Sequence, residues 1–260
     1  HRTKINKLEW LEEFVNWTLD NLELVWVVVP NKVQAHLVFQ SLNSRGLPLA
    51  LGDLVNSHLQ LQADLISGST SALMEQTTNV LSSIEDILSN DEDAIQQDFY
   101  YRYWLSNEGW ADLSKGEVLD GYKKKIEGIS TPLKMKGFLE DLKKEAKYYT
   151  NSKIGNIVGV PNSLQDLNAI QKQHIILYMA GQRKSFNNDD WKVLTEAMEL
   201  FVVRYRMAGN GRQPDREWSE WAALIDKEGR QALDGVPSGG EDNIVNSIKA
   251  MISSQAADND

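Results

Sequence analysis

The stretch Asp53-Leu-Val-Asn-Ser-His-Leu-Gln-Leu-Gln-Ala-Asp-Leu65 decides the fold class of this chain. Its apolar residues return every three or four positions, which is the spacing of one face of an α-helix. Ser71–Ser89 repeats the pattern, and the small polar residues 67–71 between the two stretches are typical of a connector. We therefore expect two neighbouring helices joined by a short loop.

Helical patterning continues towards the C-terminus. The acidic start at Asp91 suits the positive end of a helix dipole, and Pro132 suits a first-turn position. Apolar periodicity predicts these further helices: Asp91–Trp104, Lys115–Ile126, Thr131–Tyr149, Ser163–Met179, Asn188–Met207, about Trp218–Leu233 and 242–253. Glycine, proline and serine over 235–240 indicate a linker before the last of them.

The N-terminal part carries the one strand signal. Leu24-Val-Trp-Val-Val-Val29 is β-branched and aromatic and stops at Pro30, which predicts a buried strand. Helices are expected before it, over residues 7–22, and after it, from Lys32 to about Leu42. Because strand backbone groups need partners, these are expected upstream of residue 1, in another copy or at an unrecognised edge. The predicted fold class is mainly α: a multi-helical domain with a small one-strand α/β remnant at the N-terminus.

The composition is that of an ordinary globular protein, with 42% hydrophobic and 25% charged residues. Because there is no cysteine, disulfides and thiolate metal sites are excluded, and a cytoplasmic location is expected. The longest apolar run, Leu24 to Pro30, is too short to cross a bilayer, so no membrane partner is expected. A net charge of −10 argues against a surface that coats nucleic acid.

The charge is distributed unevenly along the chain. Residues 61–120 hold twelve acidic and two basic side chains, whereas residues 121–153 hold nine lysines and four acidic side chains. Lys123, Lys124 and Lys125 are candidates for contacts with nucleic acid phosphates. Acidic neighbours three or four positions away favour a solvated helical face instead.

Aromatic residues gather around Arg102. Such rings can stack on bases, but a packed interface between helices is their commoner use. The cluster consists of Phe99, Tyr100, Tyr101, Tyr103 and Trp104.

A tight turn is predicted after residue 42. Asn43 tolerates the left-handed conformation that ends a helix, and Gly46 supplies a positive φ. Asp53 is favoured by the dipole of the next helix. Turn chemistry leaves Arg45 unexplained, and a guanidinium beside free backbone N–H groups suits phosphate or carboxylate. Asn43, Ser44, Arg45, Gly46 and Asp53 are therefore candidates for nucleotide binding or for coupling.

The same turn carries a family resemblance. Phe39-Gln-Ser-Leu-Asn-Ser-Arg-Gly-Leu-Pro-Leu49, followed by Asp53-Leu54, resembles the second signature of the DUF262 family, roughly Phe-x-x-Leu-Asn-x-Arg-Gly-x-x-Leu and then Asp-Leu. This family supplies the N-terminal domains of GmrSD-like, nucleotide-dependent restriction systems. The resemblance implies a ParB-like domain with an upstream Asp-Gly-Gln-Gln-Arg motif, and often an HNH nuclease domain downstream. Neither feature occurs in this sequence, so we expect a central fragment.

A second stretch, Met198–Gly209, resembles a late DUF262 helix written approximately Leu-x-x-Phe-x-Val-Arg-Arg and then Gly. Its apolar residues form a core stripe, and Arg204 and Arg206 lie on other faces. We expect these two arginines to belong to an ion-pair network. The two resemblances together predict three parts of the chain. They are the C-terminal part of a DUF262 (ParB-like) domain over 1–66, a helical domain over 71–253 and a polar tail over 254–260.

No catalytic residue or metal site is predicted. The histidines are scattered, and no Walker loop, nucleophile elbow or HNH-like run is present. The resemblance implies a non-catalytic portion of an anti-phage restriction protein, which couples a nucleotide-binding domain to a nuclease effector. No cofactor is expected in this fragment, whereas GTP or ATP with Mg²⁺ is implied for the full-length protein.

The expected partners are the missing N-terminal and C-terminal domains, with DNA contacted only through the full-length protein and a homo-oligomer left open. The alternative function is a helical protein–protein interaction module without nucleotide or nucleic-acid chemistry. A third hypothesis is direct nucleic-acid binding through residues 121–153.

Overall fold

The computed structural model describes residues 7–23, 28–29, 38, 51–67, 72–89, 96–109, 115–170, 172–207, 215–235 and 242–257. The chain divides into a first unit, residues 1–42, and a second unit, residues 43–260. Within the described ranges every regular element is a helix, so the predicted mainly α fold is confirmed. None of these helices combines the length and the apolar character needed to cross a bilayer.

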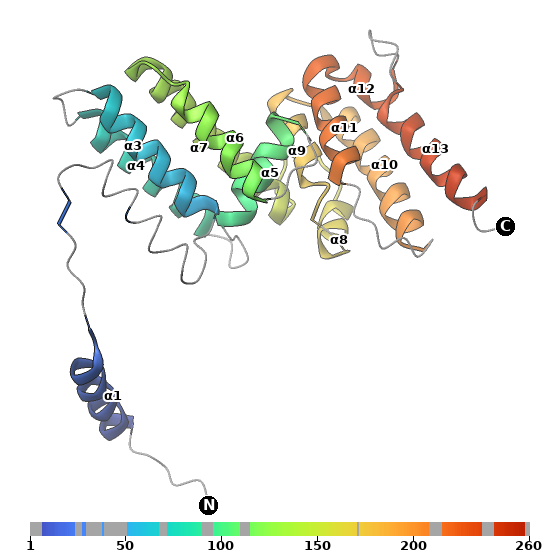
Figure 1. The fold of residues 1–260 in the computed structure, drawn as a ribbon. Helices are drawn as coiled ribbons and strands as arrows, with labels where there is room; N and C mark the ends of the chain where they lie inside the picture. The colour runs from blue at the N-terminus through green and yellow to red at the C-terminus, as the bar shows by residue number, and fades with distance from the viewer. Residues whose placement is uncertain are drawn as a thin grey trace, which may run out of the picture. The chain divides into compact units, whose positions relative to one another are not determined.

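Twelve helices lie in the described part of the chain (Figure 1). The first unit contributes α1 (Lys7–Asn21). The second unit contributes α3 (Leu51–Ser67), α4 (Ala72–Ser89), α5 (Gln96–Asn107), α6 (Lys115–Glu127), α7 (Pro132–Ile154), α8 (Ser163–Ile170), α9 (Ile175–Arg183), α10 (Asn188–Met207), α11 (Asp215–Glu228), α12 (Gln231–Asp234) and α13 (Ile244–Ala257).

Several N-terminal predictions fall outside the described residues. They are the helix Lys32–Leu42 apart from one residue, the turn residues Asn43, Ser44, Arg45 and Gly46, and the strand Leu24–Val29 apart from its last two residues. The domain boundary predicted between residues 66 and 71 stays a prediction. The helices on its two sides, α3 and α4, pack against each other.

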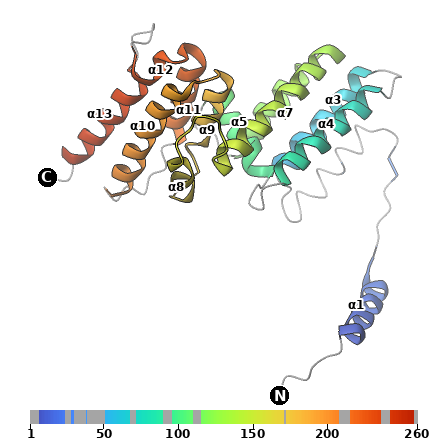
Figure 2. The same ribbon diagram turned by 180° about the vertical axis from the view of Figure 1, so that it is seen from behind.

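The first hydrophobic core is built by α3 to α7, with α4 packed against both α3 and α7 (Figures 1 and 2). Aromatic side chains fill its centre. The hydroxyl of Tyr122 donates to the carbonyl of Tyr100 at 2.8 Å, and its ring lies 4.8 Å from that of Trp104. Phe99 and Tyr103 are buried beside them. The aromatic cluster around Arg102 is therefore mostly a packed helix interface.

The second hydrophobic core is built by α8 to α13. Trp218 is fully buried there, and its ring meets those of Phe201 and Trp221 edge-on at 4.9 and 5.4 Å. Two helices, α5 and α9, contribute side chains to both cores: Leu105 of α5 lies in the second core and Met179 of α9 in the first. We call α5 and α9 the seam. Figure 1 shows them between α7 and α11.

The segment predicted as one helix, Ser163–Met179, is two helices. α8 ends at Ile170 and buries one face, whereas α9 begins at Ile175 and is buried on every side as far as Gly181. After the break, α9 packs against α5, α7 and α11. Similarly, Gly229 takes a left-handed conformation (φ 58°) and ends α11, so the predicted helix 218–233 is also divided.

Gly181 allows the close approach of α9 to the second core. A Cβ atom at this position would lie 2.5 Å from the buried ring of Trp191 and 2.9 Å from that of Phe186. We expect Gly181→Ala to lower the free energy of unfolding by about 1–3 kcal/mol, because neither ring has room to move. Urea denaturation measures the change.

Gly137→Ala is the matched control, because a Cβ at this position in α7 meets nothing within 4 Å. It should raise the free energy of unfolding by roughly 0.5–1 kcal/mol through helix propensity alone. A Gly181→Ala protein as stable as the wild type would contradict the packing described at the seam.

Candidate functional site

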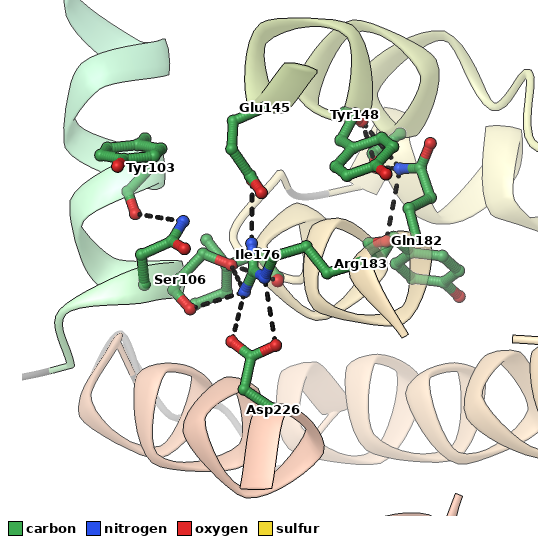
Figure 3. A network of polar contacts seen from close by, with 11 residues as sticks. Tyr103, Ser106, Glu145, Tyr148, Ile176, Gln182, Arg183 and Asp226 are labelled. Carbon is green, nitrogen blue, oxygen red and sulfur yellow. Dashed lines mark hydrogen bonds and ion pairs between the residues drawn. The ribbon is translucent and has the colours of Figure 1, made fainter. Parts of the chain in front are cut away.

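Arg183, the last residue of α9, is held by acceptors from three other helices (Figure 3). Its Nη1 donates to Oε2 of Glu145 in α7 at 2.8 Å. Its Nε and Nη2 donate to the two carboxylate oxygens of Asp226 in α11 at 3.1 and 2.6 Å. Nη2 also donates to the backbone carbonyl of Ser106 in α5 at 2.8 Å. The guanidinium fork thus ties both cores together through the seam, and we call these four residues the Arg183 network.

The network is largely removed from water. The side chains of Arg183 and Glu145 are 15% and 6% exposed, whereas Asp226 is 30% exposed. Burial raises the pKa of Glu145, and the attraction of Arg183 opposes that rise. Burial lowers the pKa of Arg183, but hydrogen bonds and the two carboxylates outweigh it, so this pKa is raised overall. Arg183 therefore stays charged, whereas the ionisation of Glu145 depends on the presence of Arg183.

Local sequence explains how these side chains reach the seam. Glu145 interrupts the buried stripe of α7, three residues after Leu142 and next to Ala146. A carboxylate in that register must point into the protein. Arg183 follows the apolar run of α9, where a cation also suits the negative end of the helix dipole. The sequence reasoning missed both residues, although a lone acid within an apolar stripe was a usable signal.

A second polar link joins α9 to α7 beside the Arg183 network (Figure 3). Nε2 of Gln182 donates to the carbonyl of Tyr148 and to the hydroxyl of Ser152, both at 2.9 Å. On the other side of the seam, the hydroxyl of Ser219 in α11 donates to the carbonyl of Leu105 at 2.6 Å. The seam is thus tied by several directional bonds in addition to apolar packing.

His174 is a fully buried titratable residue at the start of α9. The amide nitrogen of Asn168 donates to the carbonyls of Ser152 and Lys153, so its oxygen is left to accept a bond from Nε2 of His174 at 2.9 Å. Nε2 therefore carries the proton, and Nδ1 is buried with no hydrogen-bond partner in the structure. Burial, and then the charge of Arg102, lower the pKa of His174 to about 3. The described residues contain no cluster of three side chains suited to hold a metal ion.

A cleft of about 870 Å³ opens beside the Arg183 network. It lies between the end of α6 and one face of α7, and Arg183 contributes to its wall. We call it the basic cleft. Its lining residues are Tyr103, Asn107, Lys124, Lys125, Gly128, Ile129, Lys134, Gly137, Phe138, Asp141, Lys144, Glu145 and Arg183.

Only two of the three consecutive lysines of α6 line this cleft. Lys124 and Lys125 line it, whereas Lys123 does not and pairs with Asp120 at 3.2 Å. Lys125 pairs with Glu108, and its ammonium lies 5.6 Å from the ring centre of Phe138 in α7. Two of the three predicted lysines, Lys124 and Lys125, therefore line one cleft together with residues of α5, α7 and α9.

The other predicted site residues lie apart from the basic cleft. Asp53 is exposed in the first turn of α3, and Arg204 is exposed on α10. The side chain of Arg206 lies outside the described part of the chain, as do Asn43, Ser44, Arg45 and Gly46. The nucleotide-binding role of the turn and the ion-pair network of Arg204 and Arg206 stay predictions.

Fold and site together define a helical protein, over its described residues, in which a largely buried arginine joins two cores beside a basic cleft. Comparisons of this chain with protein-family models, with curated proteins and with solved structures found no match. Membership of the DUF262 family stays a prediction from the resemblance at residues 39–54 and at Met198–Gly209.

Proposed function

We propose that this chain is the non-catalytic helical portion of a DUF262-like, nucleotide-dependent restriction or anti-phage defence protein. In this proposal it couples a nucleotide-binding domain to a nuclease effector. The observation that carries the coupling role is the Arg183 network, because one guanidinium binds α5, α7 and α11 and so touches both cores. Coupling between distant sites requires a structural element whose conformation is influenced by both sites.

The proposal assigns the nucleotide chemistry to the full-length protein. GTP or ATP with Mg²⁺ would bind outside this helical portion, with Asn43, Ser44, Arg45 and Gly46 at the coupling surface. DNA would be contacted through the full-length protein in the cytoplasm. The sequence resemblance at residues 39–54 supports this assignment.

The purified chain is expected to release phosphate from GTP or ATP no faster than a protein-free control, with or without Mg²⁺. The reason is that the Asp-Gly-Gln-Gln-Arg motif, which the resemblance links to nucleotide chemistry, is not in this sequence. A phosphate-release assay checks this, with Arg45→Ala as the companion variant. Steady turnover that Arg45→Ala removes would overturn the non-catalytic role.

One observation favours the second candidate, a helical protein–protein interaction module. Within the first unit, α1 exposes about half or more of Trp10, Phe14 and Trp17, at 51%, 52% and 64%. Exposed aromatic side chains on one short helix are typical of recognition surfaces. In that case the Arg183 network serves only to stabilise the fold.

A further inference from the structure

We propose that the basic cleft binds a compact anion that carries two or more phosphate groups, such as inorganic pyrophosphate or a nucleoside diphosphate. This site is separate from the turn at residues 43–46, and it goes beyond the proposed coupling function. Three observations support it: the balance of charge in the cleft, the arrangement of its lysines and the open space above a helix glycine.

The cleft concentrates positive charge in an acidic protein. The whole chain carries a net charge of −10, yet the cleft is lined by four lysines and Arg183 against two carboxylates, Asp141 and Glu145. Glu145 is already bonded to Arg183. Two further carboxylates outside the lining pair with its cations, Glu108 with Lys125 and Asp226 with Arg183. Five cations therefore face four carboxylates, and a surplus of one positive charge remains for an anion to neutralise.

The lysines are arranged around one cavity by two helices. Along α7, cleft residues 134, 137, 138, 141, 144 and 145 recur every three or four positions, so they share one face over roughly 16 Å. Lys125 and Lys144 are held over the rings of Phe138 and Tyr148, at 5.6 and 5.5 Å. Among the described residues no ion pair engages Lys124 or Lys134, which leaves both ammonium groups available to a ligand.

Gly137 keeps the face of α7 open towards the cleft. It lies inside a long helix, where glycine costs about 0.5–1 kcal/mol relative to alanine. No packing within the described residues demands it, because a Cβ at this position meets nothing within 4 Å. The missing side chain leaves room above the helix backbone, next to Lys134 and Asp141.

The shape of the site favours a small ligand over a nucleic acid strand. The cations converge on a cleft of about 870 Å³, which is within the usual range of small-molecule sites. A strand would need a longer basic stripe. Lys123, which does not line the cleft, is already paired with Asp120. The exposed carboxylates of Glu127 and Glu140 would repel an extended polyanion.

Calorimetric titration of the whole chain with pyrophosphate, GDP and a 20-nucleotide single-stranded DNA tests the proposal, at low and at high salt. Lys134→Ala should weaken pyrophosphate binding about tenfold, since one charge-assisted hydrogen bond is lost. Gly137→Leu should weaken binding by placing a side chain in the open space above the α7 backbone, next to Lys134 and Asp141. Lys136→Ala is the matched control, because this exposed lysine lies on the same helix outside the cleft, and it should change the Kd less than about twofold. Circular dichroism verifies that each variant is folded.

Binding of pyrophosphate and GDP with equal affinity would support recognition of phosphate alone, and tighter binding of GDP would add a contribution from the base. The proposal is overturned if folded wild-type protein binds neither, or if Lys136→Ala weakens binding as much as Lys134→Ala. It is also overturned if the DNA strand binds more tightly than pyrophosphate and depends on the same lysines. None of these results bears on phosphate release, so failure here and failure of the proposed function are distinguishable.

Discussion

Replacing Arg183 by methionine is expected to lower the free energy of unfolding by about 3–5 kcal/mol, the usual cost of removing one partner from a buried ion pair. Methionine fills much of the same space but leaves Glu145 buried without its cation and Asp226 without its bidentate partner. The carbonyl of Ser106 also loses a donor. Urea denaturation at neutral pH measures the loss.

The double variant Arg183→Met with Glu145→Gln separates the loss of the hydrogen bonds of Arg183 from the cost of leaving the charge of Glu145 buried. Glutamine removes the uncompensated charge, so we expect the double variant to be more stable than Arg183→Met by about 1–3 kcal/mol. Arg183→Lys keeps the charge without the planar fork, and its stability should fall between those of the wild type and Arg183→Met. Equal stability of the wild type and Arg183→Met would show that the network contributes nothing to the fold.

The cost of Arg183→Met should shrink as the pH falls. Burial already raises the pKa of Glu145, and the loss of Arg183 removes the main interaction that opposes that rise, so only the hydrogen bond with Asn107 still opposes it. Between its unfolded pKa and its raised folded pKa, the native state binds more protons than the unfolded state. Lower pH therefore stabilises this variant relative to neutral pH, over that window.

His174 is expected to make the wild-type protein sensitive to acid. Its folded pKa of about 3 lies below the ordinary value of 6.5. Between these values the unfolded state binds the proton and the native state does not, so stability is lost as the pH falls from 6.5 towards 3. At 1.36 kcal/mol per pKa unit, the loss from this one residue reaches roughly 4–5 kcal/mol.

His174→Gln is the variant that isolates this effect, because its amide nitrogen can still donate to the oxygen of Asn168. It should cost about 1–2 kcal/mol at pH 7 through altered packing. Its stability should then fall less steeply than that of the wild type between pH 6.5 and 4. The comparison requires urea midpoints of both proteins across that range. Parallel curves would contradict the buried, neutral state of His174.

The helices with regular apolar spacing could be predicted from the sequence. The stretch from Asp53 to Leu65 lies within α3, and the prediction for residues 131–149 found α7 but ended it five residues early. The end of α7 depends on distant groups: Asn168 bonds the carbonyls of Ser152 and Lys153, and Gly155 follows with a φ of 69°. A local pattern does not contain such contacts.

The site was predictable only in part, for a related reason. Lys124 and Lys125 stood out as a basic run, but the face of α7 opposite them and Arg183 of α9 become their neighbours only on folding. Arg183 itself looks like an ordinary charged residue at a helix end. Its role depends on Glu145, 38 positions away, and Asp226, 43 positions away.

The Arg183 network should make the two cores unfold as one cooperative unit. Native-state hydrogen exchange tests it most directly, by comparing amides of α4 in the first core with amides of α10 in the second. In the wild type, the most protected amides of both helices should open with the same free energy, as one cooperative unit. In Arg183→Met the two values should separate by more than about 1 kcal/mol. Equal values in the variant, or separate values in the wild type, would contradict the claim.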